Sequence, residues 1–222
     1  MPITFVDNGA VQNTTATEFT QAYPSAVGVG SLLVATWRMA STTNTMAVSD
    51  SVNGSWTQAL RQNNTTDGVS VAVFYKYNTA AGTPTVTFTS NVAAAQWITI
   101  DEYSGLLTLT DPIDQTEGAE ADSTSTMTSD SFTTTSNYEL FIVGTGFGGA
   151  TTQTAGTNYT QRRVTSDGRL SCEDRIVTAV GSYTASTTAL DVLTAHIAVA
   201  TFVGVVDPLV ARSGNWRRRG RR

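Results

Sequence analysis

Two adjacent pairs of carboxylates, Asp101-Glu102 and Glu173-Asp174, are the residues in this sequence that come nearest to a hydrolytic site. A glycosidase needs two carboxyl groups on either side of one bond, and a strand provides them at positions i and i+2, which face the same side. Adjacent residues on a strand face opposite sides of the sheet. Both pairs therefore argue against a glycosidase.

Arginines close to the second pair give its carboxylates a simpler role. We expect a structural ion pair of Glu173 with Arg175, or of Asp174 with Arg169. Such pairs are common where opposite charges lie on neighbouring parts of a sheet. The sequence therefore predicts that these acids stabilise the structure and do not catalyse a reaction.

One histidine and one cysteine are the remaining candidates for nucleophilic chemistry. His196 lies in the apolar stretch DVLTAHIAVATF, and Cys172 lies between polar residues on an expected strand. A nucleophile needs an adjacent base, and the chain has no second histidine to supply one. We predict a buried structural histidine, an inert buried thiol and a protein that is not an enzyme.

The segment DPIDQTEGAEAD, residues 111–122, is the best candidate for a metal site. It gathers carboxylates, with Asp111, Asp114 and Glu117 as the candidate ligands, and Ca²⁺ prefers hard oxygen ligands in a flexible loop. The spacing matches no EF-hand, and a solvated acidic loop accounts for the composition adequately. We expect such a loop and no cofactor, with Ca²⁺ as the weaker alternative.

The stretch SDSVNGSWTQ, residues 49–58, contains Asp50, Asn53, Gly54 and Trp56. Asn-Gly between two strands favours a type I′ hairpin turn, in which both residues have positive φ. In this interpretation Asp50 accepts backbone N–H bonds and Trp56 packs inward. A ligand-binding loop is the alternative.

These residues must be positioned by strands. The chain contains 40 threonines and only 14% charged residues, which favours β-structure because threonine is β-branched. Apolar and polar residues alternate in short runs, and no helical period appears. We predict an all-β, two-sheet antiparallel β-sandwich of the jelly-roll or concanavalin-like kind, with residues 1–207 as the body and 208–222 as an extended C-terminal tail.

Within that body we expect thirteen short strands, including Thr85–Thr89, Trp97–Tyr103 and Met127–Phe132. A hairpin is expected between Tyr77 and Thr85. The apolar stretch AVATFVGV, residues 198–205, is expected to lie centrally in its sheet, because nearly every position is apolar. Thirteen strands exceed what one open sheet holds without splitting into two.

Charge separates the body from the tail. Six of the 13 basic residues lie between residues 212 and 222, leaving seven against 18 acidic residues in the rest, or −11. Arginine pairs with carboxylate or phosphate through two parallel hydrogen bonds, and tryptophan anchors by stacking or burial. The sequence therefore predicts a partner-binding tail, and the residues expected to make the contact are Arg212, Trp216, Arg217, Arg218, Arg219, Arg221 and Arg222.

Docking on an acidic protein surface is the favoured interpretation of the tail, because sister subunits already provide complementary charge. Nucleic acid is a partner only through the tail, since the acidic body repels it, and a frayed terminus is the alternative. One cysteine cannot form an internal disulfide. The N-terminus MPITFVDNG lacks a signal-peptide pattern and no apolar run is long enough for a membrane span, so we expect neither secretion nor membrane insertion.

A succession of short motifs resembles a known family. VSDSVNGSWTQ, VAVFYKYNTAAGTPTVTF, ITIDEYSGL with DPID, NYEL, NYTQRR and LSCEDRIVTAVGSYTAS follow one another between residues 28 and 204. Their order and spacing are similar to those of jelly-roll-like β-sandwich domains in phage virion proteins and large bacterial surface proteins. The resemblance implies a structural or adhesive module without catalytic residues. The arginine-rich end is not part of the family pattern.

The leading hypothesis is a non-enzymatic structural component of a phage virion, made in the host cytoplasm: a capsid decoration, cement or fibre-type protein. Its partners would be other virion proteins and copies of itself, reached through the tail. The alternative is a carbohydrate-binding or adhesin module that uses the loop aromatics Trp56 and Tyr103, with Ca²⁺ in the acidic segment.

Overall fold

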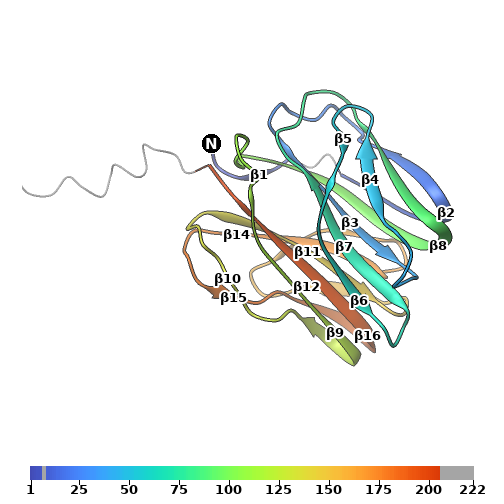
Figure 1. Cartoon of the computed structure of the whole chain (residues 1–222). Helices are drawn as coiled ribbons and strands as arrows, with labels where there is room; N and C mark the ends of the chain where they lie inside the picture. Colours follow the sequence, from blue (N-terminus) through green and yellow to red (C-terminus); the bar gives the residue numbers. More distant parts are fainter. Residues whose placement is uncertain (7–8, 206–222) are drawn as a thin grey trace, which may run out of the picture.

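The computed structural model of the 222-residue chain describes residues 1–6 and 9–205. Every regular element in these ranges is a β-strand, and no helix occurs in them. The strand pairs are antiparallel and form two large sheets that pack on each other, as Figure 1 shows. The predicted all-β, two-sheet antiparallel sandwich is confirmed. The predicted tail, 208–222, lies outside the described residues.

The first half of the chain forms the first sheet. The path of hydrogen-bonded neighbours runs β5-β4-β8-β3-β7-β6, and β1 and β2 also pair with β8. The strands are β1 (Thr4–Phe5), β2 (Ala10–Ala22), β3 (Leu32–Met39), β4 (Ala47–Asp50), β5 (Gly54–Ser55), β6 (Thr57–Asn64), β7 (Val69–Lys76) and β8 (Thr85–Ser104).

The second half forms the second sheet, in the order β12-β16-β11-β14-β13, with β9 also paired to β16 and a small β10-β15 ladder beside it. The strands are β9 (Ile113–Thr128), β10 (Phe132–Thr133), β11 (Glu139–Phe147), β12 (Gln153–Ala155), β13 (Thr160–Val164), β14 (Leu170–Val177), β15 (Ser182–Tyr183) and β16 (Ser186–Val203).

The two halves share one pairing scheme. In the first half a long strand, β8, pairs with β3, which pairs with β7 and then β6. In the second half β16, β11, β14 and β13 follow in the same way, and β2 lies on β8 as β9 lies on β16. The short strands β4 and β12 also occupy matching places, each on the first part of the long strand. Each half is therefore the same supersecondary unit, arranged against the other.

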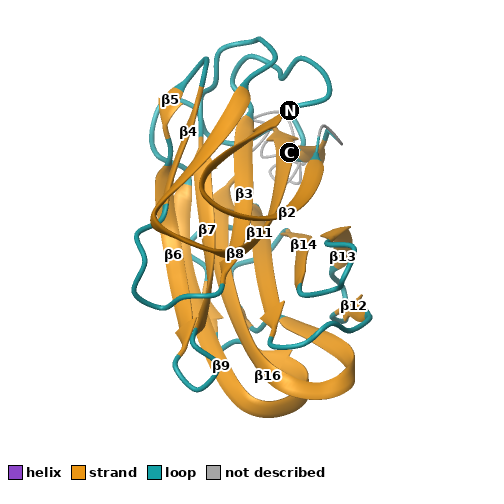
Figure 2. Ribbon diagram, turned by 90° about the vertical axis from the view of Figure 1, so that its right-hand side faces the viewer, coloured by secondary structure: helices purple, strands orange, loops and turns teal. Residues whose placement is uncertain are grey.

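The long strands β8 and β16 bend, so that one part of each strand covers a face of the sheet to which the other part belongs. Register shifts interrupt the β2-β8 and β9-β16 ladders, and such bulges bend a strand. As a result Phe88 of β8 packs edge-on against Trp37 of β3, with ring centroids 5.3 Å apart, although a different part of β8 is hydrogen-bonded to β3. Figure 2 shows β9 and β16 curving together in this manner.

The fold consequently has three apolar cores. One lies between the sheets and includes Val34, Val73, Ile142 and Phe202. The second covers the opposite face of the first sheet, and the third covers the opposite face of the second sheet. Strands β3 and β11 are buried along their whole length, which explains why their sequences are apolar at nearly every position.

Several strand predictions need correction. The segments predicted as separate strands at Thr85–Thr89 and Trp97–Tyr103 form the single strand β8. The hairpin predicted between Tyr77 and Thr85 does not exist, because β3 lies between β7 and β8. Residues 198–203 lie in β16, between β11 and β9, so the predicted central position is confirmed.

Candidate functional site

The first predicted site is the arginine-rich tail. The contact residues predicted there all lie outside the described residues: Arg212, Trp216, Arg217, Arg218, Arg219, Arg221 and Arg222. The tail therefore stays a prediction from sequence. The structure does describe the surface and interior of the body from which that tail extends.

The acidic segment is mostly a strand, so the prediction of a solvated loop is wrong. Residues 113–128 form β9, which pairs with β16 from Ile113↔Phe202 to Thr128↔Ser186. Asp111 precedes it, and both of its carboxylate oxygens accept from the Tyr75 hydroxyl, at 2.9 and 2.8 Å. Residues 113–128 form a strand in spite of their polar composition, because they pair with the long strand β16.

The three candidate Ca²⁺ ligands do not converge. Asp114 accepts from the Thr135 amide at 2.8 Å and hydroxyl at 2.5 Å, and Glu117 accepts from the Gly118 amide at 2.9 Å. Asp111 is held by Tyr75. Among the described residues no group of three or more His, Cys, Asp or Glu could hold a metal ion.

The stretch at residues 49–58 is a turn, as predicted, but of another type. Gly54 has φ +75°, whereas Asn53 is not among the residues with positive φ, so the predicted type I′ turn is wrong. Asp50 Oδ1 accepts from the amides of Val52 at 2.7 Å and Asn53 at 2.6 Å, and Oδ2 accepts from Trp56 Nε1 at 2.7 Å. Asp50 and Trp56 are thus internal to the turn and not available as ligand groups.

The aromatic residues of the carbohydrate hypothesis are enclosed. Trp56 is 7% exposed and Tyr103 is 0% exposed. Trp56 belongs to the core on the outer side of the first sheet, and Tyr103 packs against Phe5 with ring centroids 5.4 Å apart. Neither ring offers the open face that stacking on a sugar requires.

The buried acids pair with arginines other than those predicted. Asp174 Oδ2 lies 2.8 Å from Arg162 Nε, and Asp101 Oδ1 lies 2.9 Å from Arg163 Nε. A register shift between Gln161 and Arg163 allows consecutive arginines of β13 to reach toward the interior. The pairing predicted between Asp174 and Arg169 is wrong, because the acid's partner comes from the neighbouring strand.

Glu173 and Arg175 do not pair with each other. Glu173 is fully buried and accepts from the Thr187 hydroxyl at 2.6 Å and the Gly156 amide at 3.0 Å. Burial raises the pKa of Glu173 to about 7. Arg175 instead lies over the rings of Tyr159 and Tyr183, with its guanidinium carbon 5.6 and 5.1 Å from their centroids. The predicted Glu173–Arg175 ion pair is wrong.

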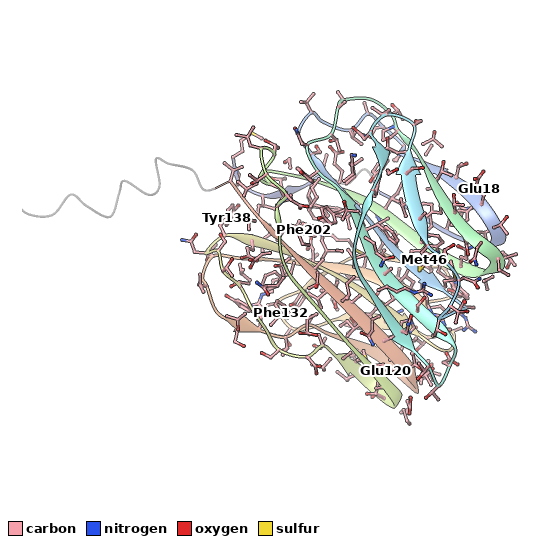
Figure 3. All side chains as sticks on the ribbon, in the orientation of Figure 1. Glu18, Met46, Glu120, Phe132, Tyr138 and Phe202 are labelled. Carbon is pink, nitrogen blue, oxygen red and sulfur yellow. The ribbon has the colours of Figure 1, made fainter. Side chains whose placement is uncertain are left out.

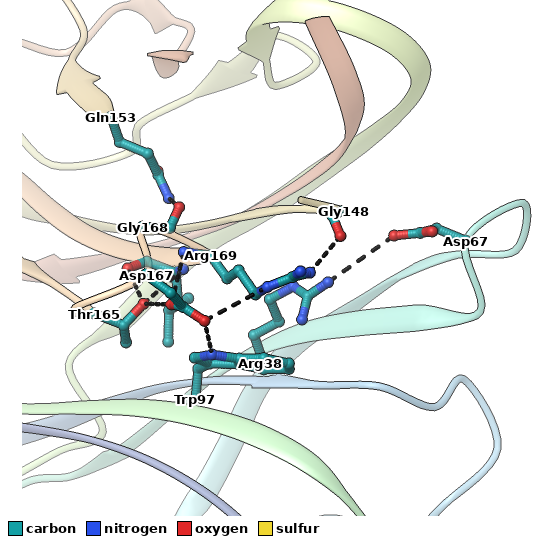
Figure 4. Close-up of polar contacts among 10 residues, drawn as sticks. Arg38, Asp67, Trp97, Gly148, Gln153, Thr165, Asp167, Gly168 and Arg169 are labelled. Carbon is teal, nitrogen blue, oxygen red and sulfur yellow. Dashed lines mark hydrogen bonds and ion pairs between the residues drawn. The ribbon is translucent and has the colours of Figure 1, made fainter. Parts of the chain in front are cut away.

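A second polar cluster joins the two sheets, as Figure 4 shows. The guanidinium carbon of buried Arg38 lies 4.4 Å from the centroid of the Trp97 ring, and that of Arg169 lies 5.6 Å from it. Trp97 Nε1 donates to Asp167 Oδ2 at 2.7 Å, and Arg38 Nη2 lies 3.9 Å from Asp67 Oδ2. Burial and the nearby Arg169 lower the pKa of Arg38 to about 10, so Arg38 remains a cation at neutral pH.

The candidates for nucleophilic chemistry are sealed inside. His196 is 0% exposed, and burial together with the nearby charge of Arg38 lowers the pKa of His196 to about 3, so its imidazole is neutral. Cys172 is also 0% exposed, and burial raises the pKa of its thiol well above the ordinary value. A neutral, shielded thiol is a poor nucleophile. The predicted burial of both residues is confirmed.

Shallow hollows on the described surface include the following two. One, of about 280 Å³, is lined by Thr57, Tyr75, Lys76, Tyr77 and Asn78. The other, of about 230 Å³, is lined by Thr14, Thr15, Ala95, Gln96, Trp97 and Asp167. Asp167 is the only carboxylate in these two linings, so neither hollow contains the pair of acids that a glycosidase needs.

The exposed charge of the body is acidic. Every basic side chain in the described ranges is buried or half-buried. Arg61 and Lys76, for example, donate to backbone carbonyl oxygens. In Figure 3, Glu18 lies on β2 of the first sheet and Glu120 lies on β9 of the second sheet. The exposed charged residues that the structure describes are Glu18, Asp67, Asp111, Glu120, Asp122, Asp130 and Asp191.

The sequence analysis did not predict the roles of Arg38, the Arg162-Arg163 doublet or Glu139, although each leaves a signal in the sequence. Arg38 interrupts the apolar run LLVATWRM, and a cation in a buried strand requires a partner. The Arg162-Arg163 doublet breaks the expected alternation, which indicates a bulge. Glu139 opens the apolar strand ELFIVGTGF, and it is fully buried.

Within the described ranges, no helix has the length and apolar character needed to cross a membrane. Comparisons with protein-family models, with curated proteins and with solved structures find no match to this chain.

Proposed function

We propose that this protein is a non-enzymatic structural component of a larger assembly, a phage virion, in which it acts as a capsid decoration, cement or fibre-type subunit. Its C-terminal tail, residues 208–222, would attach it to neighbouring subunits. The observation that supports this most is the separation of charge. The described body exposes acids and encloses its basic side chains, while residues 212–222 contain six arginines and a tryptophan.

This separation of charge supports attachment of the tail of one subunit to the acidic surface of another. An arginine guanidinium can form two parallel hydrogen bonds with one carboxylate, and several such contacts along one segment steer two subunits together. Trp216 can add a buried aromatic contact, which is typical of residues that dominate binding energy. Copies of this same chain supply the acidic surface, so we propose other virion proteins and sister copies as the partners.

The interior of the body supports a structural and not a catalytic role. Some of its ionisable groups join the two sheets: Arg163 of β13 pairs with Asp101 of β8, and Asp167 accepts from Trp97 Nε1 of β8. The histidine and the cysteine are enclosed. A sandwich held together in this way is a rigid carrier for an attachment segment.

The test compares the full chain with a chain that ends at residue 207. We expect the truncated protein to unfold at the same denaturant concentration as the full chain but to lose incorporation into particles. A matched variant with all six tail arginines changed to lysine keeps the charge and loses the two-bond geometry, so it should incorporate weakly. Normal incorporation of the truncated chain would contradict the proposed attachment.

Salt dependence separates protein partners from nucleic acid. Contact with phosphates lowers the logarithm of the binding constant by about 0.7 to 0.9 per contact for each tenfold rise in salt. Docking through a buried Trp216 should be less steep, and Trp216→Ala should weaken it more than any single arginine substitution. A slope that matches several phosphate contacts would assign the tail to nucleic acid instead.

A further inference from the structure

The end of β16, where the C-terminal segment leaves the body, is fastened by backbone hydrogen bonds, three of which are donated by the amides of residues 203–205. The amide of Val203 donates to Pro112 O at 2.7 Å, that of Gly204 to Tyr138 O at 2.9 Å, and that of Val205 to Gly105 O at 2.8 Å. We call residues 203–205 the tail root. Its three acceptors come from separate parts of the chain, so the tail root is held only while those parts stay together.

Glu139 lies directly beside the tail root. It is the first residue of β11 and is paired in register with Val203 on one side and Val177 on the other. Its side chain is fully buried; Oε1 accepts from the Ser136 amide at 2.9 Å, and Oε2 has no hydrogen-bond donor among the described residues. A buried carboxylate with one bare oxygen is costly, whereas a protonated carboxyl needs an acceptor there.

That acceptor is Asp114, near the start of β9. Consecutive amides hold the two carboxyl groups: the Thr135 amide donates to Asp114 Oδ2 at 2.8 Å and the Ser136 amide donates to Glu139 Oε1 at 2.9 Å. The Thr135 hydroxyl also donates to Asp114. Burial opposes the charged form of Asp114, but the bonds from Thr135 outweigh it and lower the pKa of Asp114. Burial raises the pKa of Glu139 to about 7, and the charge of Asp114 adds to that rise.

The other groups described around Glu139 carry no positive charge. Strand β16 presents the Thr201 hydroxyl, β14 presents Val177 as the register partner, and the 134–138 segment presents the Ser136 amide. The Tyr138 hydroxyl is used elsewhere, as it accepts from the Ile3 amide at 2.6 Å. None of the ion pairs found among the described residues includes Glu139 or Asp114.

We propose that Glu139 and Asp114 share one proton, and that this proton fastens the tail root to the body. With the proton present, a carboxyl donates to a carboxylate and joins the start of β11 to the start of β9. With the proton lost, the buried carboxylate of Glu139 and the half-buried carboxylate of Asp114 repel each other, because two like charges in one site cannot both be ionised without penalty. The ends of β9, β11 and β16 then separate, and the tail root is released.

The direction of the pH effect follows from the raised pKa of Glu139. The folded state holds the proton more tightly than the unfolded chain, in which a glutamate has a pKa of about 4.3. The stabilising effect is therefore complete below that pH and is lost as the pH rises through about 7. The device fastens the tail root in mildly acidic solution and loosens it in alkaline solution. It does not depend on the proposed assembly role.

Hydrogen exchange on the isolated full chain tests the proposal. The amides of Val203, Gly204 and Val205 should lose protection, corrected for the intrinsic exchange rate, between pH 6 and pH 8.5. The loss should approach about tenfold per pH unit above the pKa, the limit for one proton. Glu139→Gln, which is neutral at every pH, should show no such loss.

A matched control is Glu173→Gln, which removes another fully buried carboxyl at a different place in the second sheet. It should leave the pH dependence at the tail root as in the unmodified protein. A separate measurement, the NMR titration of the Glu139 side-chain carboxyl in the unmodified chain, should give a pKa well above the ordinary value. An ordinary carboxyl pKa for Glu139, or the same loss of protection in Glu139→Gln, would overturn the proposal.

Discussion

The two halves of the molecule share a pairing scheme and differ in what they bury. The outer core of the first half is made of rings and aliphatic side chains, with Phe19 stacked on Phe88 at 5.0 Å and both against Trp37. The second half buries the carboxyl groups of Glu139 and Glu173 within the same scheme. The first half also buries the carboxyl groups of Asp101 and Glu102, so both halves contain ionisable groups and differ in the side chains that surround them.

The largest expected effect tests how far the halves are equivalent. Gly68 and Gly168 each follow an aspartate and precede β7 and β14, with φ +67° and +66°. A Cβ at Gly68 meets nothing within 4 Å, whereas one at Gly168 falls 1.6 Å from Thr151 O. We expect Gly168→Ala to lower the free energy of unfolding by about 3 kcal/mol or more, from strain and overpacking.

Gly68→Ala is the matched control, and it should cost only about 1 kcal/mol because it introduces strain without a clash. Urea unfolding of both variants measures the difference. Equal effects would mean that the second-half turn is not packed against residue 151.

A second prediction concerns a buried carboxyl group of the second half. The pKa of Glu173 is raised to about 7 by burial, so its contribution to the free energy of unfolding falls as the pH rises from the ordinary glutamate range to about 7. Glu173→Gln should reduce that pH-dependent fall in the free energy of unfolding by about 2 kcal/mol. At pH 5, where the buried carboxyl is protonated, the substitution should slightly lower the free energy of unfolding. Urea unfolding at several pH values measures this, and an unchanged pH profile would contradict the burial of an ionisable group.

The smallest expected effect compares the turns before β6 and β13. Asp50→Ala removes the acceptor of Trp56 Nε1 and of two amides, and should lower the free energy of unfolding by about 1–3 kcal/mol. At the matching place Tyr159→Phe removes one hydroxyl bond to Thr184 O and should cost about 1 kcal/mol. Thermal or urea unfolding checks both, and a larger effect of Tyr159→Phe would reverse the comparison.

The sequence predicted those features that depend on local pattern. Alternation identified the strands, the Asn53-Gly54 pair identified a turn, and the apolar surroundings of His196 predicted its burial. These predictions succeed because period-2 patterns report which face of a strand is buried.

Features that depend on contacts between distant parts of the chain were predicted poorly. The acidic residues of β9 resemble a loop until its long pairing with β16 is known. Asp174 pairs with Arg162 because of a bulge in β13, and proximity in sequence pointed to another arginine. The turn type depended on the φ of Asn53, which the surrounding bonds determine, since Asn53 Oδ1 also accepts from the Ala80 amide at 2.9 Å. The tail contact residues remain a prediction.

The two ends of the described body meet at one place. A Cβ on Gly204 would lie 2.6 Å from Ile3 Cδ1, and the Ile3 amide donates to the hydroxyl of Tyr138, the residue whose carbonyl receives the Gly204 amide. A host polypeptide could therefore enter at Ile3 and leave at Val205 with its own two cut ends close together. The sandwich has the shape of an insertable module, which could be grafted into a surface loop of an unrelated scaffold without separating that scaffold's flanking strands.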